Sequence, residues 1–211
     1  KIQMLPYPFS YFSSIWGSSF HDVYAVGGSE AGYQSSRILH FDGQAWVPSS
    51  TGCGAEAMGV WGSSENDVYV IYKGGAVMHF NGSSWSEIAS PADQNLNGIW
   101  GDGSGSVFAV GDRGRIISST GAEWSKAFSG SAAGFTKTWG ASANEVYAVA
   151  IDGTLSYYNG SVWSSLDVPA LSQHYISDLW GYKVPGSDQT KLFFVGTGGR
   201  IVHFDGTNWL V

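Results

Sequence analysis

The stretch WGSSENDVYVIYKGGAVMHFNGSSW, at residues 61–85, is one complete copy of a unit that recurs along the chain. A Trp-Gly pair opens it, and a polar turn leads into the β-branched and aromatic run at 67–71. A Gly-rich turn at 73–75 precedes a second such run at 76–80, and Asn81-Gly82 leads to the closing tryptophan. Such runs, bounded by Gly and Asn turns, are typical of short antiparallel strands.

Tryptophan marks both ends of every copy of this unit. Successive Trp-Gly pairs are 45, 39, 39 and 41 residues apart, and successive closing tryptophans are 39, 39, 39 and 46 apart. Both series indicate a base unit of about 39 residues with local insertions, which is the signature of a repeat architecture. The two series use all ten tryptophans: Trp16, Trp61, Trp100, Trp139 and Trp180 in the pairs, and Trp46, Trp85, Trp124, Trp163 and Trp209 at the closing position.

An Asp-Gly, Asn-Gly or Thr-Gly turn precedes each closing tryptophan, which then opens a fourth strand. Asp-Gly and Asn-Gly are the strongest short hairpin signals, because both residues tolerate positive φ. Four short antiparallel strands in about 40 residues form one blade of a β-propeller. We therefore predict an all-β, five-bladed β-propeller of four-stranded antiparallel blades, with residues 1–211 forming a single domain.

The repeated tryptophans are expected to wedge between neighbouring blades, because a single blade cannot bury both of its faces. Burial of about 200 Å² by each indole corresponds to an upper bound of roughly 5 kcal/mol. Both ends of the sequence, at Ile2 to Leu5 and at Trp209 to Val211, fall in the fourth-strand phase. We predict five closed blades, with one end closing the ring as a strand shared between the termini. The alternative is a longer array, with more blades on either side.

The unit of Trp-Gly, strand, Gly turn, strand and Asp-Gly-x-x-Trp resembles the Asp-box (BNR-type) propeller repeats of bacterial exported proteins. It is also similar, more loosely, to the blades of propeller lectins of the tachylectin and insect-pathogen fucose-lectin types. The usual Asp-box has a residue between Asp and Gly, whereas Asp42-Gly43 has none. The resemblance implies an exported propeller, and the lectin likeness implies carbohydrate binding.

Composition narrows the classes of partner and the compartment. The formal net charge is −7, and the ten Lys and Arg residues are scattered. Nucleic-acid binding depends on basic patches, so we expect neither nucleic acid nor an anionic membrane surface as a partner, and no apolar run approaches a membrane span. Cys53 is the only cysteine, so no intrachain disulfide forms. Low charge with abundant Ser, Gly, Asn and Trp favours a secreted or cell-surface location, with the periplasm as a further option.

Three insertions interrupt the repeat and indicate where function is concentrated, because the framework does not need them. They lie within 27–36, around 169–177 and within 182–190. In a closed ring, units one and five are neighbours, and their first two insertions emerge on one face. This predicts a ligand site formed by Glu30, Tyr33, Gln34, Gln173, His174 and Tyr175. The alternative is that these loops are solvated length variants.

Two constellations invite a chemical interpretation. His40, His79 and His203 share one repeat position; a metal ring needs ligands that converge within about 2 Å of one ion, so we expect inter-blade hydrogen bonds and no metal or other cofactor. A sialidase needs a cluster of arginines. Three arginines share one repeat position in different blades, so they follow the repeat and are not expected to converge: Arg37, Arg115 and Arg200. We predict no enzymatic activity, with a glycoside hydrolase of the sialidase type as the less favoured alternative.

The remaining hypotheses are binding functions. We predict a non-catalytic binding or scaffolding propeller, with carbohydrate as the most plausible small ligand. The alternative is a protein–protein interaction platform within a larger surface assembly. The blade-to-blade segments at 49–57, 90–97, 129–136 and 169–177 differ strongly in sequence, which argues against five equivalent sugar pockets and favours one irregular binding face.

Overall fold

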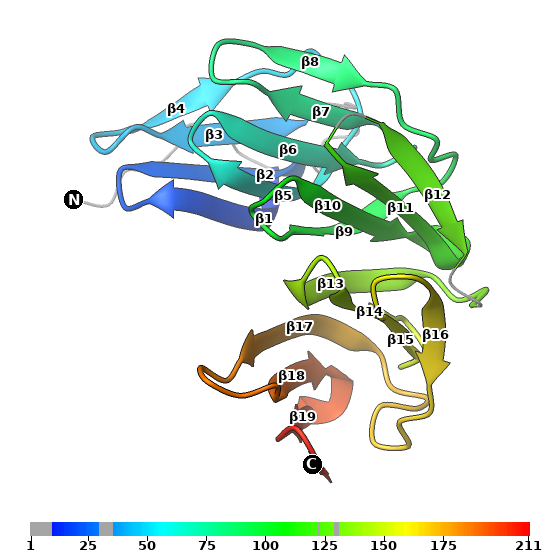
Figure 1. Cartoon of the computed structure of the whole chain (residues 1–211). Helices are drawn as coiled ribbons and strands as arrows, with labels where there is room; N and C mark the ends of the chain where they lie inside the picture. The colour runs from blue at the N-terminus through cyan, green and yellow to red at the C-terminus, as the bar shows by residue number, and fades with distance from the viewer. Residues whose placement is uncertain (1–9, 30–35, 122, 129–130) are drawn as a thin grey trace.

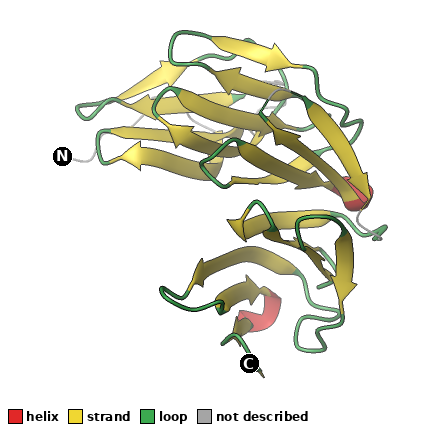
Figure 2. Cartoon of the chain, viewed as in Figure 1, coloured by secondary structure: helices red, strands yellow, loops and turns green. Residues whose placement is uncertain are grey.

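The structure is a computed structural model that describes residues 10–29, 36–121, 123–128 and 131–211. Its strands form five antiparallel sheets of four strands, each sheet in the order of the sequence. Figure 2 shows that strands make up nearly all of the regular structure. The described helices are single 3-10 turns, η1 (Asp112–Gly114) and η2 (Thr197–Gly199). No helix in these ranges has the length and apolarity that a membrane crossing requires.

Each sheet corresponds to one copy of the repeat, and we call the sheets blades 1 to 5. Blade 1 consists of β1 (Ser10–Ser19), β2 (Asp22–Ser29), β3 (Arg37–Phe41) and β4 (Trp46–Ser49). Blade 2 consists of β5 (Ala57–Ser64), β6 (Asp67–Tyr72), β7 (Val77–Phe80) and β8 (Trp85–Ile88). Blade 3 consists of β9 (Leu96–Gly101), β10 (Ser106–Gly111), β11 (Arg115–Thr120) and β12 (Trp124–Phe128). Blade 4 consists of β13 (Phe135–Ser142), β14 (Glu145–Ala150), β15 (Leu155–Tyr158) and β16 (Trp163–Leu166). Blade 5 consists of β17 (Ile176–Lys183), β18 (Thr190–Gly196), β19 (Ile201–Phe204) and β20 (Trp209–Leu210).

The blades stand side by side in chain order, and their first strands line the inside of the arc. Extended contacts join β1 to β5, β5 to β9, β9 to β13 and β13 to β17. Figure 1 shows the blades succeeding one another from blue to red around this arc. The prediction of five four-stranded antiparallel blades in a β-propeller is confirmed.

The hairpin turns before the closing tryptophans form as the sequence predicts. In blade 1 the Asp42 Oδ1 atom accepts hydrogen bonds from the backbone N–H groups of Gln44 and Ala45, both at 2.9 Å. Gly43 completes the turn with a φ of 90°, a value that glycine adopts without steric cost. Asn81, Asn159 and Asp205 make the same pair of bonds in blades 2, 4 and 5.

In blades 1 to 4, the Trp-Gly tryptophan stacks on the glycine of the next blade's Trp-Gly pair. A Cβ atom at Gly101 would lie 2.4 Å from the ring of Trp61, so only glycine leaves room for the indole there. We call the side of a blade that carries this tryptophan its forward face, and the side that receives the preceding indole its backward face. The same contact recurs between blades: Trp16 on Gly62, Trp100 on Gly140, and Trp139 on Gly181.

The cores lie between blades, not within them. The residue four positions before the Trp-Gly tryptophan is fully buried in blades 2 to 5, as Ala57, Leu96, Phe135 and Ile176. Closing tryptophans add a second contact, because Trp85 meets the ring of Tyr24 edge-on at 6.1 Å. Trp124 on Tyr69 and Trp163 on Phe108 repeat it. Seven of the ten tryptophans thus make these contacts between blades, whereas Trp180 is 58% exposed.

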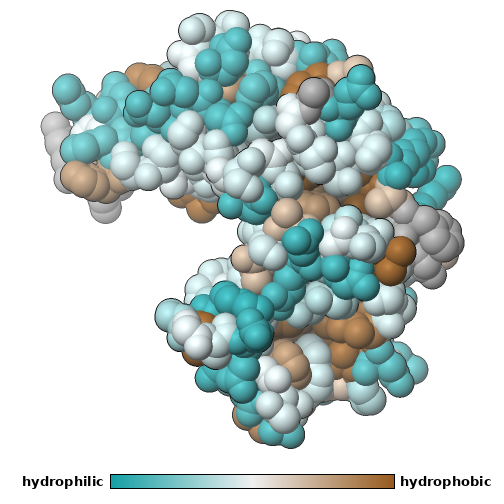
Figure 3. All heavy atoms as spheres, in the orientation of Figure 1, coloured by the Kyte–Doolittle hydropathy of each residue, from teal (hydrophilic) through white to brown (hydrophobic). Residues whose placement is uncertain are grey.

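Among the described residues, the ring is open between blade 1 and blade 5. Among the described strands, β1 and β17 are not in extended contact, and Figure 3 shows a C-shaped molecule with its opening between these two blades. The expectation that five blades close on themselves is therefore not met. Blade 5 takes its fourth strand, β20, from the C-terminal segment, while Ile2 to Leu5 lie outside the described residues.

Candidate functional site

Turns and linkers divide the edges of the blades into two faces. The β6–β7 turn contacts the segment joining blades 2 and 3, since a Cβ at Gly75 would lie 2.8 Å from the Ala92 carbonyl oxygen. On the opposite side, a Cβ at Gly82 in the β7–β8 turn would lie 2.7 Å from Asn66 in the β5–β6 turn. We call the first side the linker face and the second the hairpin face.

The extended linker between β16 and β17 is a built structure on the linker face. Val168 and Leu171 anchor it, with 5% and 0% of their surface exposed. Its turn is closed by hydrogen bonds from the N–H groups of Leu171 and Ser172 to the Val168 carbonyl, at 2.9 and 3.2 Å. Arg200 of blade 5 donates to the Ala170 carbonyl at 3.2 Å. The backbone of the segment is therefore tied to both blades.

Gln173 lies at the tip of this linker in a strained backbone conformation. Its φ is 62°, and its N–H donates to the Asp152 carbonyl at 2.8 Å. A non-glycine residue at positive φ costs free energy and persists only where its surroundings impose it. The cause is close packing on the β14–β15 turn, where a Cβ at Gly153 would lie 1.8 Å from the Leu171 carbonyl oxygen.

The linker and this turn enclose a polar cup of about 350 Å³. Asp152 and Asp167 contribute carboxylates, and neither forms an ion pair among the described residues. One oxygen of Asp152 accepts the Thr154 N–H at 2.9 Å. The lining is completed by side chains and backbone from both segments: Gly153, Ser165, Leu166, Val168, Ser172 and Gln173. We call this pocket the polar cup.

The structure describes three of the six residues of the predicted site. Gln173 lines the polar cup. His174, which follows it, is half-buried, and Tyr175 is 44% exposed. Glu30, Tyr33 and Gln34 lie outside the described residues. The prediction that the two loops share one site depended on contact between blades 1 and 5, and the described strands do not make that contact.

The equivalent hollow at blade 2 differs in chemistry. It is lined by Gly74, Gly75 and the alanines Ala76, Ala89 and Ala92, with Glu87 as its one carboxylate. The polar cup has two carboxylates, three hydroxyls and an amide at comparable places. The linker face therefore carries different hollows on different blades, in agreement with the divergence of the linker sequences.

Two of the three repeated histidines, His40 and His79, bond within their own blades, which corrects the expectation of inter-blade hydrogen bonds. His40 Nε2 lies 2.6 Å from Asp22 Oδ1, and His79 Nε2 lies 2.7 Å from Asp67 Oδ1. Ser18 donates to Asp22, so the carboxylate stands between the hydroxyl and the imidazole, an order that does not activate a serine nucleophile. The described residues contain no group of three His, Cys, Asp or Glu side chains arranged to hold a metal ion.

The tyrosine stacked on each of these histidines is held in its neutral form. Tyr24 lies 4.3 Å from the His40 ring and Tyr69 lies 4.4 Å from the His79 ring. Burial, and then the nearby Asp22 carboxylate, raises the pKa of Tyr24 to about 12. Burial and Asp67 raise the pKa of Tyr69 to about 12 as well. These phenols stay protonated at neutral pH and pack as structural rings.

Arg115 and Arg200 each bond to a linker. Arg115 donates to Asp93 at 2.6 Å, and Lys126 lies 3.6 Å from the same carboxylate. Arg200 holds the Ala170 carbonyl, as described above. These two members of the arginine repeat position thus tie their own blades to the preceding segment of chain.

The chain is similar in fold to proteins of known structure. The sequence matches no protein-family model and no curated protein. Among solved structures, "YCF48 bound to D1 peptide" aligns with a TM-score of 0.70 and 17% identity, over 98% of this chain and 67% of that one. The GH74 enzyme of Niastella koreensis aligns with a TM-score of 0.63 and 17% identity, over 94% of this chain and 31% of that one. The computationally designed Ika8 protein aligns with a TM-score of 0.66 and 17% identity, over 95% of this chain and 60% of that one. At this identity the likeness shows the propeller fold alone.

Proposed function

We propose that this chain is a non-catalytic binding propeller whose linker face holds a protein segment, with the polar cup as the anchor for one cationic side chain. The observation that carries the proposal is the pair of carboxylates, Asp152 and Asp167, that line a fixed hollow without an ion-pair partner among the described residues. A Lys or Arg side chain entering the cup would supply the positive charge that these carboxylates lack, together with further hydrogen-bond donors.

Further features support a protein ligand. The cup lacks an aromatic side chain, whereas stacking on an aromatic face is what we expect of a sugar pocket. The chain carries a net charge of −7, which accelerates the encounter with a basic partner at low salt. The solved YCF48 structure binds a peptide, so a propeller of similar fold serves this kind of ligand.

Carbohydrate is the second candidate, and one observation favours it. Three hydroxyls, from Thr154, Ser165 and Ser172, lie with the Gln173 amide around a hollow of about 350 Å³. That volume is at the lower end of the range for small-ligand pockets, roughly 300–1,000 Å³. We place the chain, in either case, at the cell surface or outside the cell, and we assign it no catalytic role.

Two arrays distinguish the candidates. The labelled chain is applied to an array of short peptides that vary in Lys and Arg content, and in parallel to a glycan array. We expect saturable binding to basic peptides that weakens as salt is raised, and the loss of most of it in the double variant Asp152→Asn/Asp167→Asn. Asp188→Asn, an exposed carboxylate on the hairpin face, is the control that changes charge without touching the cup. Binding to glycans alone selects the second candidate, and silence on both arrays refutes the assignment of the cup as a ligand site.

A further inference from the structure

The described residues leave the backward face of blade 1 uncovered. Phe12 is 47% exposed, although the residue at its repeat position is 0% exposed in each of the other four blades. Ile15 is 67% exposed, whereas Val60 and Leu179 at that position are 5% and 6% exposed. Gly17 is exposed and receives no indole from the described residues, whereas the other four Trp-Gly glycines are buried.

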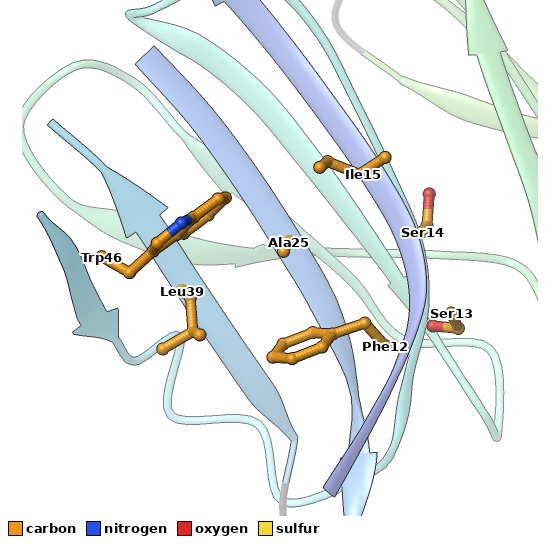
Figure 4. Close-up of a pocket in the computed structure, with 7 residues that line it drawn as sticks. All are labelled: Phe12, Ser13, Ser14, Ile15, Ala25, Leu39 and Trp46. Atoms are coloured by element: carbon orange, nitrogen blue, oxygen red, sulfur yellow. The ribbon is translucent and has the colours of Figure 1, made fainter. Parts of the chain in front are cut away.

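Phe12 and Ile15 line an apolar groove of about 460 Å³. Figure 4 shows Phe12 and Ile15 from β1 and Trp46 from β4 on the same side of the blade, with Ala25 and Leu39 between them. Ser13 and Ser14 supply the only polar side chains of the groove. Its chemistry is that of the inter-blade cores.

The forward face of blade 5 is uncovered in the same way. Trp180 is 58% exposed, and Val195 is 43% exposed. The four residues at the repeat position of Val195 are all 0% exposed: Val26, Ile71, Val110 and Val149. Ile201 is 61% exposed, and its counterparts are 0–3% exposed: Ile38, Val77, Ile116 and Leu155.

The two faces are complementary halves of one kind of interface. Every Trp-Gly tryptophan but Trp180 rests on a glycine, and every Trp-Gly glycine but Gly17 receives an indole among the described residues. The remaining indole stands at one end of the arc and the remaining glycine at the other. Because each filled interface joins consecutive blades in one orientation, both ends present geometry that fits a blade of the same kind.

We propose that these two faces are unfilled blade interfaces whose occupant is a further blade of the same Trp-Gly repeat, carried on the same polypeptide, so that the five blades form an arc of a larger ring. All four filled interfaces join blades linked in one chain, and a covalent link gives a docking blade a high effective concentration. The solved propellers also extend beyond the aligned arc, which covers 67% of one and 60% of another.

Other occupants fit less well. Blade 5 does not reach Gly17 to close the ring by itself. A second copy would bring five blades, and the opening of the C-shaped molecule in Figure 3 is smaller than the molecule. One or more single blades, each with an indole and a glycine in register, satisfy both faces.

The test supplies such blades from the chain's own repeats. A second copy of residues 50–128, which contains blades 2 and 3 and the linker before each of them, is added after Val211. Hydroxyl-radical footprinting with mass spectrometry then follows Trp180, whose peptide is unique because only 50–128 is duplicated. We expect the oxidation rate of Trp180 to fall severalfold, to that of the covered Trp139 in the same monomer.

A matched control uses the same extension with Gly62→Val in the added copy alone. A side chain there would meet the indole, as a Cβ at Gly62 would lie 2.6 Å from Trp16, so Trp180 should regain its reactivity. A parallel extension with residues 89–166 presents Gly101 in place of Gly62 and guards against one added pair failing to fold.

Three outcomes would overturn the proposal. The first is a Trp180 that stays as reactive in both extended chains as in the original. The second is a Trp180 already protected in the original monomer, which would mean that five blades close on themselves. The third is protection in the original chain that rises with concentration together with a dimer in sedimentation, which would make a second copy the occupant.

Discussion

The indoles of Trp139 and Trp180 hold the same repeat position in different surroundings. Trp139 rests on Gly181, where a Cβ would lie 2.8 Å from its ring, while Trp180 is 58% exposed. The contribution of a Trp-Gly tryptophan to the free energy of unfolding therefore depends on whether a following blade covers it.

Alanine substitution separates the two tryptophans. Trp139→Ala should lower the free energy of unfolding by about 3–5 kcal/mol, because it leaves a cavity between blades 4 and 5. Trp180→Ala should lower it by about 1 kcal/mol or less, as exposed positions do. Urea denaturation of the two variants measures the difference, and equal losses would contradict the uncovered forward face.

His203 lacks the aspartate partner that the equivalent histidines of blades 1 and 2 have. It stacks on Phe193 at 4.3 Å, but its Nε2 is buried without a hydrogen-bond partner among the described residues. Blade 5 has Lys191 where blades 1 and 2 have the aspartate that pairs with the histidine. Lys191→Asp should restore the pair and raise the free energy of unfolding by about 1 kcal/mol. Lys191→Asn, which matches it in shape, should gain less, and the measurement is the denaturation midpoint of both.

Glu145 makes the contact between blades 4 and 5 sensitive to acid. Its carboxylate accepts hydrogen bonds from Thr190 and from Lys183, the latter at 2.7 Å. Burial alone would raise the pKa of Glu145, but these bonds outweigh it and hold the pKa below its ordinary 4.5. A depressed folded-state pKa contributes stability that is complete above pH 4.5 and is lost as the pH falls through the folded value. Glu145→Gln should therefore lose less stability on acidification than the parent chain, as read from melting temperatures across that range.

At the scale of elements, the linker between β16 and β17 depends on the glycine beneath it. Gly153 and Gly74 have nearly the same positive φ, 83° and 84°, so alanine would suffer similar backbone strain at both. Their surroundings differ, because a Cβ at Gly153 would lie 1.8 Å from the Leu171 carbonyl oxygen, whereas Gly74 has nothing within 4 Å.

This pair gives a controlled test of the polar cup. Gly74→Ala should cost about 1 kcal/mol from strain alone. Gly153→Ala should cost clearly more and should displace the linker, abolishing peptide binding in the array experiment. Retained binding in a folded Gly153→Ala chain would show that the cup does not depend on the linker conformation.

The sequence pointed to only one of the residues that line the polar cup. The two-residue extension of the linker pointed to Gln173, which the structure places in the cup. The sequence pattern did not single out Asp152 and Asp167, because one is a turn residue and the other follows the end of a strand. Only the fold of the linker onto the turn brings the two carboxylates together.

At the scale of the molecule, the arc is a stack in which each blade contacts only its neighbours. The stability of such an array is close to a sum of blade and interface contributions. Blades 2 to 4 have two interfaces, and blades 1 and 5 have one each among the described residues.

Hydrogen exchange should reflect this arrangement. We expect the slowest amide exchange in β10 of blade 3, where Val107, Ala109 and Val110 are 0–2% exposed. The fastest strand exchange is expected in β19 and β20 of blade 5, because local opening there breaks few contacts. Uniform protection across all five blades would indicate a closed ring or a covered end.

The sequence by itself determined the number of blades, their strands, their hairpin turns and the wedge role of the tryptophans. These features are encoded within one repeat. Asp42 closes its turn with backbone groups two and three residues away. Each Trp-Gly pair supplies an indole for the contact with the following blade and a glycine for the contact with the preceding blade. Only the tertiary structure decided that the ring stays open and that Asp152 and Asp167 share a cup. Closure depends on the angle at every inter-blade interface, summed over the arc, and that angle is set by side-chain packing between blades that no pattern within one repeat records.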